Sequence, residues 1–114
     1  MIEPYAIATQ YAVTLLPETD INSYIYEITV DYRGHGLWAV TRHRQCMNTD
    51  GGWDWEPIPS ERDDDWIATH RFDLDTAIRL AKEAAPHGTV NGITATEALA
   101  RAAQRQARQD GATT

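Results

Sequence analysis

Cysteine, basic residues and long apolar runs are scarce in this sequence of 114 residues. The single cysteine, Cys46, cannot form a disulfide within the chain. No apolar run reaches the roughly 18 residues that a membrane span needs, and the first four residues lack the basic segment of a signal peptide. Ten basic residues stand against 17 acidic ones, a formal net charge of −7. A general nucleic-acid-binding protein needs a basic face. We therefore expect a soluble cytoplasmic protein that binds neither membrane nor nucleic acid.

Aromatic residues are missing from the last part of the chain. All ten lie at or before Phe72, whereas residues 73–114 contain eleven alanines. The charge changes at nearly the same place, since residues 1–75 carry 14 acidic and 5 basic side chains and residues 76–114 carry 3 acidic and 5 basic ones. The overall apolar content, 42%, is that of a globular domain. These contrasts predict an acidic β half followed by an alanine-rich helical half.

Alternation of apolar and polar residues predicts the strands of the first half. The clearest strand is residues 24–32, where Tyr24, Tyr26, Ile28, Val30 and Tyr32 would share one face. Glycine-containing segments at 33–36 and 48–52 predict tight hairpin turns. Further strands are expected at residues 11–15, 37–47, 53–56 and 66–72.

Helical spacing of apolar residues begins after Phe72. Asp73 or Asp75 is expected to cap a helix that ends at Pro86 and Gly88. This helix should cover the sheet, because the helical half alone cannot bury enough apolar surface to fold. Thr94 and Glu97 form a capping box that opens a second helix.

Together these elements predict an α+β fold. An antiparallel sheet of about four strands, arranged as a meander of hairpins, would be covered by one helix and followed by a C-terminal alanine-rich helix. Residues 1–103 would form a single domain. Residues 104–114 would form a polar tail that is disordered, an exposed helix or a surface for a partner, because they have almost nothing to bury. A homodimer through the C-terminal helix is one way to cover that surface.

Four groups of segments carry a resemblance that spans roughly residues 11–100. They are residues 15–22, residues 38–41, residues 58–60 together with 71–77, and residues 90–92. On these segments the chain resembles uncharacterised small proteins encoded by actinobacteria and their bacteriophages. The resemblance implies a small accessory protein, phage-encoded or from the host, and it assigns no activity and no catalytic residue.

A catalytic reading of the sequence depends on cysteine and histidine. Cys46 lies three residues from His43, a spacing that puts them on opposite faces of a strand, although Arg42 and Arg44 share the Cys46 face and could favour a thiolate. None of the four histidines lies in a zinc-binding spacing. His43 and His70 could meet on neighbouring strands, so a small metal-dependent or His/Asp hydrolase is an alternative. We assign no catalytic residue, no metal ligand and no cofactor.

Acidic residues are densest at Asp63, Asp64 and Asp65. Carboxylate oxygens suit a hard cation, but the spacing of a calcium-binding loop is absent. Solvated acids, or acids at the N-terminus of a helix, explain the run equally well. Residues 50–75 hold nine acidic and two basic residues. Such a field could imitate the phosphate backbone and inhibit a DNA-processing enzyme, which is a second alternative.

Two tryptophans beside acidic residues give the leading hypothesis. Trp53 and Trp55 would share a strand face, and aromatic side chains flanked by carboxylates can anchor a protein partner. Burial in the core is the other reading. A DNA-reading helix-turn-helix over residues 75–108 is disfavoured, because its connecting segment is too long. We therefore expect a non-enzymatic interaction protein whose candidate partner-binding residues are Trp53, Asp54, Trp55, Glu56, Asp63, Asp64 and Asp65.

Overall fold

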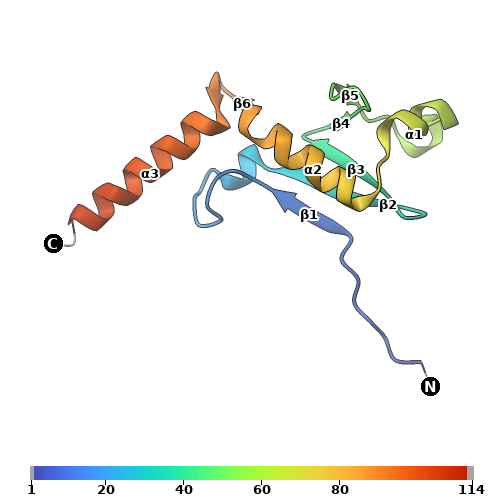
Figure 1. The fold of residues 1–114 in the computed structure, drawn as a ribbon, viewed down its shortest axis with the longest axis horizontal. Coiled ribbons are helices and arrows are strands. Elements are labelled where there is room, and N and C mark those ends of the chain that lie inside the picture. Colours follow the sequence, from blue (N-terminus) through green and yellow to red (C-terminus); the bar gives the residue numbers. More distant parts are fainter. Residues whose placement is uncertain (1, 113–114) are drawn as a thin grey trace.

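The computed structural model describes residues 2–112 and the side chains of residues 2–108. Its main element is a five-stranded antiparallel sheet in the order β1-β2-β3-β4-β5 (Figure 1). The predicted α+β class is confirmed, with one more strand than expected. The strands are β1 (Gln10–Val13), β2 (Ile28–Gly34), β3 (Leu37–Arg42), β4 (Gln45–Met47) and β5 (Trp53–Trp55).

Three α-helices follow or connect these strands, together with short 3-10 turns and a two-stranded hairpin. Helix α1 connects the sheet to α2, and α2 crosses one face of the sheet (Figure 1). The elements are η1 (Ser23–Tyr26), η2 (Pro59–Glu61), α1 (Asp64–His70), α2 (Leu74–Ala84), η3 (Ala85–His87), β6 (Thr89–Val90), β7 (Ile93–Thr94) and α3 (Ala95–Ala112).

The main core lies between the sheet and α2. Pairing of Val30 with Val40 places these two side chains on the same face, and both are fully buried. Helix α2 presents Ala77 and Ala81 to this face, and their small side chains let the helix approach the sheet closely. Asp73 caps α2 by accepting a hydrogen bond from the Thr76 N–H, as one of the two predicted caps should.

The opposite face of the sheet is also buried where β3 and β4 meet. Ala39, Thr41 and Cys46 point away from α2 by alternation, yet all three are buried. The segment that leads from β5 through α1 covers them, since the Cys46 sulfur lies 3.7 Å from both the His70 carbonyl oxygen and an Arg71 guanidinium nitrogen. The sheet is therefore covered on both faces where β3 and β4 meet, by α2 on one side and by this segment on the other.

Two strand predictions need new boundaries. Residues 24–32 do not form one strand, because residues 23–26 make a 3-10 turn and β2 begins at Ile28. Residues 37–47 form β3 and β4 rather than one strand. His43 adopts a left-handed backbone with φ of 56° and closes a turn that no glycine or proline marks.

The strand predicted at residues 66–72 is wrong, because residues 66–70 belong to α1. The Asp63 carboxylate accepts a hydrogen bond from the Trp66 N–H at 2.8 Å and starts the helix. Only Phe72 pairs with the sheet, through a bridge to Trp38. In α1, Trp66 and His70 lie one turn apart on one face, which the apparent alternation concealed.

A second, smaller core holds the base of α3. Leu16 and Tyr26 pack against Ala95 and Ala98, and the Tyr26 hydroxyl donates a hydrogen bond to the Ile93 carbonyl. Helix α3 continues to Ala112, so the described part of the predicted 104–114 tail is helical, while residues 113–114 lie outside the described residues.

The N-terminal segment and α3 both project from the sheet (Figure 1). The radius of gyration is 17.3 Å, against about 13 Å for a compact domain of this length. Among the described residues, no helix is both long and apolar enough to cross a membrane.

Candidate functional site

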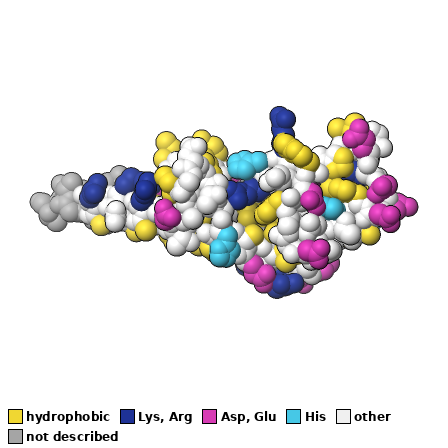
Figure 2. Space-filling model, turned by 90° about the horizontal axis from the view of Figure 1, so that it is seen from above, with side chains coloured by type: hydrophobic (Ala, Val, Ile, Leu, Met, Phe, Trp, Pro, Cys, Tyr) yellow, Lys and Arg dark blue, Asp and Glu magenta, His cyan; other side chains and the backbone are white. Residues whose placement is uncertain are grey.

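The residues predicted to bind a partner lie at the end of the molecule formed by β4, β5 and α1. Side-chain contacts between Asp54 on β5 and His70 on α1, 2.8 Å apart, join the two elements. Acidic side chains gather at this end, whereas basic side chains line the C-terminal helix at the other end (Figure 2). The structure therefore brings the predicted residues into one region, but it gives them different surroundings.

The two tryptophans of β5 differ sharply in exposure. Trp53 is half-buried and packs against the main core. Trp55 is 69% exposed, and Ile58 just after the strand is 60% exposed. Both indoles lie on the sheet face that α2 covers, but α2 packs mainly across β1, β2 and β3. Trp55 thus lies beyond the helix, and only Trp55 of the pair can reach a partner.

Asp54 makes two hydrogen bonds within the protein. Its Oδ2 accepts from the Asn48 amide at 3.0 Å and lies 2.8 Å from Nε2 of His70. The Asn48 bond first, and the His70 bond second, lower the pKa of Asp54 below its usual value. This carboxylate therefore holds the β4–β5 turn against α1 as well as contributing negative charge.

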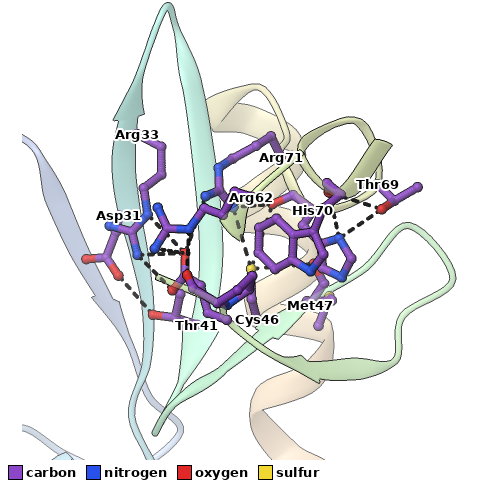
Figure 3. Close-up of polar contacts among 12 residues, drawn as sticks. Asp31, Arg33, Thr41, Cys46, Met47, Arg62, Thr69, His70 and Arg71 are labelled. Atoms are coloured by element: carbon purple, nitrogen blue, oxygen red, sulfur yellow. Dashed lines mark hydrogen bonds and ion pairs between the residues drawn. The ribbon is translucent and has the colours of Figure 1, made fainter. Parts of the chain in front are cut away.

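His70 is 6% exposed and its ring is enclosed by close contacts. The ring stacks on Trp66 with the centroids 4.0 Å apart and the planes 1° from parallel. Its Nδ1 lies 2.8 Å from both the Trp66 carbonyl oxygen and the Thr69 hydroxyl (Figure 3). Since Nε2 contacts Asp54, both ring nitrogens have partners, an arrangement suited to fixing α1 rather than to moving a substrate proton.

Glu56 points in the opposite direction from Trp55. Its side chain is 14% exposed and forms ion pairs with Arg33 at 3.1 Å, Arg62 at 3.4 Å and Arg71 at 3.3 Å. The three arginines come from the end of β2, the segment after η2 and the segment after α1, and they converge on this one carboxylate (Figure 3). Glu56 therefore contributes nothing to an exposed acidic surface.

The three consecutive aspartates have separate roles. Asp63 is the N-cap of α1, and Asp64 and Asp65 are exposed in its first turn. Negative charge at this position is stabilised by the positive end of the helix dipole. Of the seven predicted residues, Trp55, Asp64 and Asp65 are thus exposed without an internal side-chain role, whereas Asp54 and Asp63 are exposed and hold the local fold.

Cys46 lacks the surroundings of a reactive cysteine. It is fully buried, and burial first, with the Glu56 charge second, raises the pKa of its thiol to about 11. Its basic neighbour is Arg71. Arg42, which was expected to share its face, instead donates a hydrogen bond to the Thr89 carbonyl.

The predicted meeting of His43 and His70 does not produce a metal site. His43 lies in the β3–β4 turn, and the structure gives His70 the Asp54, Thr69 and Trp66 partners described above. Across the described part of the chain, no three His, Cys, Asp or Glu side chains gather closely enough to hold a metal ion. Within the described side chains, Asp54 with His70 is the one Asp–His contact that the hydrolase alternative could use.

The segment between α2 and α3 contains η3 and the β6–β7 hairpin, so it is not the short turn of a helix-turn-helix. On α3, Arg105 forms an ion pair with Asp20 at 2.6 Å. Arg105 is therefore paired within the chain, and the homodimer through this helix stays a prediction.

Sequence reasoning missed the group formed by Arg33, Arg62 and Arg71. Arg33 and Arg71 are 38 positions apart in the sequence, and no spacing rule links the three arginines. A signal did exist for the Trp66–His70 stack, since a separation of four residues places two side chains on one helix face.

No protein-family model, curated protein or solved structure matches this chain.

Proposed function

We propose that this chain is a small non-enzymatic interaction protein that binds a protein partner at the end of the molecule that carries Trp55, Ile58 and the acidic first turn of α1. The observation that carries this proposal is the exposure of Trp55 on an edge strand, next in sequence to Glu56, whose partly buried ion-pair network fixes the strand. Large aromatic side chains held on a rigid element are the usual anchors of protein interfaces.

Charge supports a partner with basic residues around an apolar contact. Asp64 and Asp65 are exposed at the same end of the molecule as Trp55, and acidic side chains gather there (Figure 2). In this arrangement Trp55 and Ile58 supply the apolar contact, and the carboxylates steer a basic surface toward it. We further propose that the chain is an accessory protein, encoded by an actinobacterium or its phage, that acts on a host protein.

The chemistry of the buried residues favours binding over the hydrolase alternative. The His70 ring has partners on both nitrogens and is covered by Trp66, and the Cys46 thiol is buried with a raised pKa. A general base or nucleophile must reach a substrate atom. Neither group has that access in this arrangement.

The test is capture of host proteins by the tagged full chain from an actinobacterial lysate, followed by mass spectrometry. Trp55→Ala should lose a partner that the wild-type chain retains at both low and high salt. Tyr24→Ala is a matched control, because Tyr24 is also 69% exposed but lies in η1, beside a different core. Equal capture by both variants would reject the Trp55 surface.

The same capture experiment distinguishes the DNA-mimic alternative from the proposed function. A mimic acts through charge, so its partner would be a DNA-processing enzyme released steeply as salt rises. In that case Asp64→Asn combined with Asp65→Asn would abolish capture, and Trp55→Ala would leave it unchanged.

A further inference from the structure

A pocket of about 270 Å³ lies beside the Glu56 ion-pair network. It opens between the β2–β3 turn and the segment that runs from η2 to the end of α1. Its basic lining is Arg33, His35, Arg62 and Arg71, and apolar lining comes from Leu37 and Ile67. The pocket therefore places three guanidinium groups and an apolar wall around one small space.

The charges in this cluster do not balance. Three arginines share the single carboxylate of Glu56, which leaves two positive charges in a protein whose overall formal charge is −7. Burial first lowers the pKa of Arg71, and the like charges of Arg33 and Arg62 lower it further, whereas Cys46 and Glu56 act in the opposite direction. All three guanidinium groups lie within 3.4 Å of the same carboxylate, so they repel one another, and a second anion would reduce that repulsion.

Donors remain available for such an anion. Arg33 uses Nε and Nη2 to bind Glu56, and Arg62 uses Nε for the Pro57 carbonyl and Nη2 for Glu56. Among the described residues, none of the contacts shown engages Nη1 of either arginine. Planar guanidinium groups match the oxygen pairs of carboxylate and phosphate.

We propose that this pocket binds a small molecule with an oxyanion head group, either phosphate or carboxylate, attached to a short apolar body. The head group would contact Arg33 and Arg62, and the body would lie against Leu37 and Ile67. The volume is just below the roughly 300–1,000 Å³ of typical ligand sites, which limits the ligand to a small molecule. Binding here does not require the Trp55 partner.

The experiment is an NMR titration of the full-length protein at constant ionic strength with phenyl phosphate, benzoate and benzyl alcohol. The two anions are expected to give saturable shifts in the amide signals of Gly34, His35, Gly36 and Leu37, and uncharged benzyl alcohol is not. Tighter binding of phenyl phosphate would identify phosphate as the head group, and tighter binding of benzoate would identify carboxylate. Equal binding of benzyl alcohol, or shifts reproduced by sodium chloride, would overturn the proposal.

Variants test the named arginines. Arg33→Gln and Arg62→Gln should each weaken the binding of the preferred anion at least fivefold. Arg79→Gln should leave it unchanged, because Arg79 pairs only with Glu83 on α2 among the contacts shown. Unchanged affinity in both Arg33→Gln and Arg62→Gln would overturn the proposal, and the remaining amide signals report whether each variant is folded.

Glu56→Gln should strengthen anion binding, whereas the arginine substitutions should weaken it. Removing the competing carboxylate leaves the three arginines without their internal anion, so this variant should bind the added anion more tightly than the wild-type chain. Its melting temperature should also rise more on addition of that anion. A smaller rise than in the wild-type chain would contradict an anion site built from these arginines.

Discussion

Replacement of Glu56 by glutamine should cost far more stability than the same change at an exposed ion pair. Glu56 is the only acidic partner shown for Arg33, Arg62 and Arg71 among the described residues, and its side chain is 14% exposed. Loss of one partner of a buried ion pair costs about 3–5 kcal/mol. We expect a value near the lower limit, about 3 kcal/mol, because water reaches the Arg33 side chain, which is 29% exposed.

Glu83→Gln is the matched control for this prediction. Glu83 pairs with Arg79 one turn away on α2, and both side chains are 60% exposed. Such a pair contributes about 0.3–0.5 kcal/mol. The measurement is urea unfolding at pH 7, followed by circular dichroism and tryptophan fluorescence so that coincident transitions establish two-state behaviour.

The expected melting temperature of Glu56→Gln is about 10 °C or more below that of the wild-type chain, given about 4 °C per kcal/mol for a domain of this size. If Glu56→Gln and Glu83→Gln cost the same, and both cost less than 1 kcal/mol, the three arginines do not depend on Glu56. Glu56 would then not hold the three arginines in a structural ion-pair network.

Three further predictions concern the residues around this network. His70→Ala should lower the free energy of unfolding by about 2 kcal/mol, through loss of one aromatic stack and its hydrogen bonds. His87→Ala should change this free energy little, because the His87 side chain is exposed, and equal effects of the two substitutions in urea unfolding would reject the structural role of His70. Cys46 should react with a thiol reagent at least one hundredfold more slowly in the native protein than in urea, because a thiol pKa near 11 instead of 9.0 leaves about one hundredth of the thiolate at neutral pH. The pKa of Asp54 in the folded protein lies below the usual value of 3.8. Its contribution to folding stability is therefore present above about pH 4 and is lost as pH falls through the lowered folded pKa. Asp54→Asn should flatten the decrease of the urea midpoint between pH 5 and pH 2, and an unchanged slope would show that Asp54 makes no such contribution.

Local patterns predicted the elements whose signals come from adjacent residues. The alternation around Ile28 and Val30 corresponds to the buried side of β2, and the glycine turn at residues 51–52 joins β4 to β5. Asp73 caps α2 as expected. In each case the side chain or turn residue that determines the structure lies within four positions of the backbone that it fixes.

The errors arose where one spacing fits two structures or where a turn lacks its usual residue. Residues 66, 68 and 70 satisfy strand alternation, but residues 66 and 70 also satisfy helical spacing, and the cap from Asp63 decides for the helix. The β3–β4 turn uses His43 in a left-handed conformation, so no glycine marked it. The arginine cluster depends on three distant segments, and only tertiary folding brings these together.

The exposure of Trp55 follows from the dimensions of the fold. A helix of eleven residues is about 16 Å long and about 10 Å wide, whereas five strands span about 19 Å from β1 to β5. Because α2 packs mainly across β1, β2 and β3, the apolar side of β5 extends beyond it. Under the proposed function, the partner adds a second apolar layer where α2 ends. Glu56, on the reverse face, holds the same strand rigid through its three arginines, so Trp55 is presented without a loss of loop entropy on binding. The Glu56 network and the Trp55 surface are therefore expected to be coupled, and Glu56→Gln should weaken partner capture even though Glu56 touches no partner.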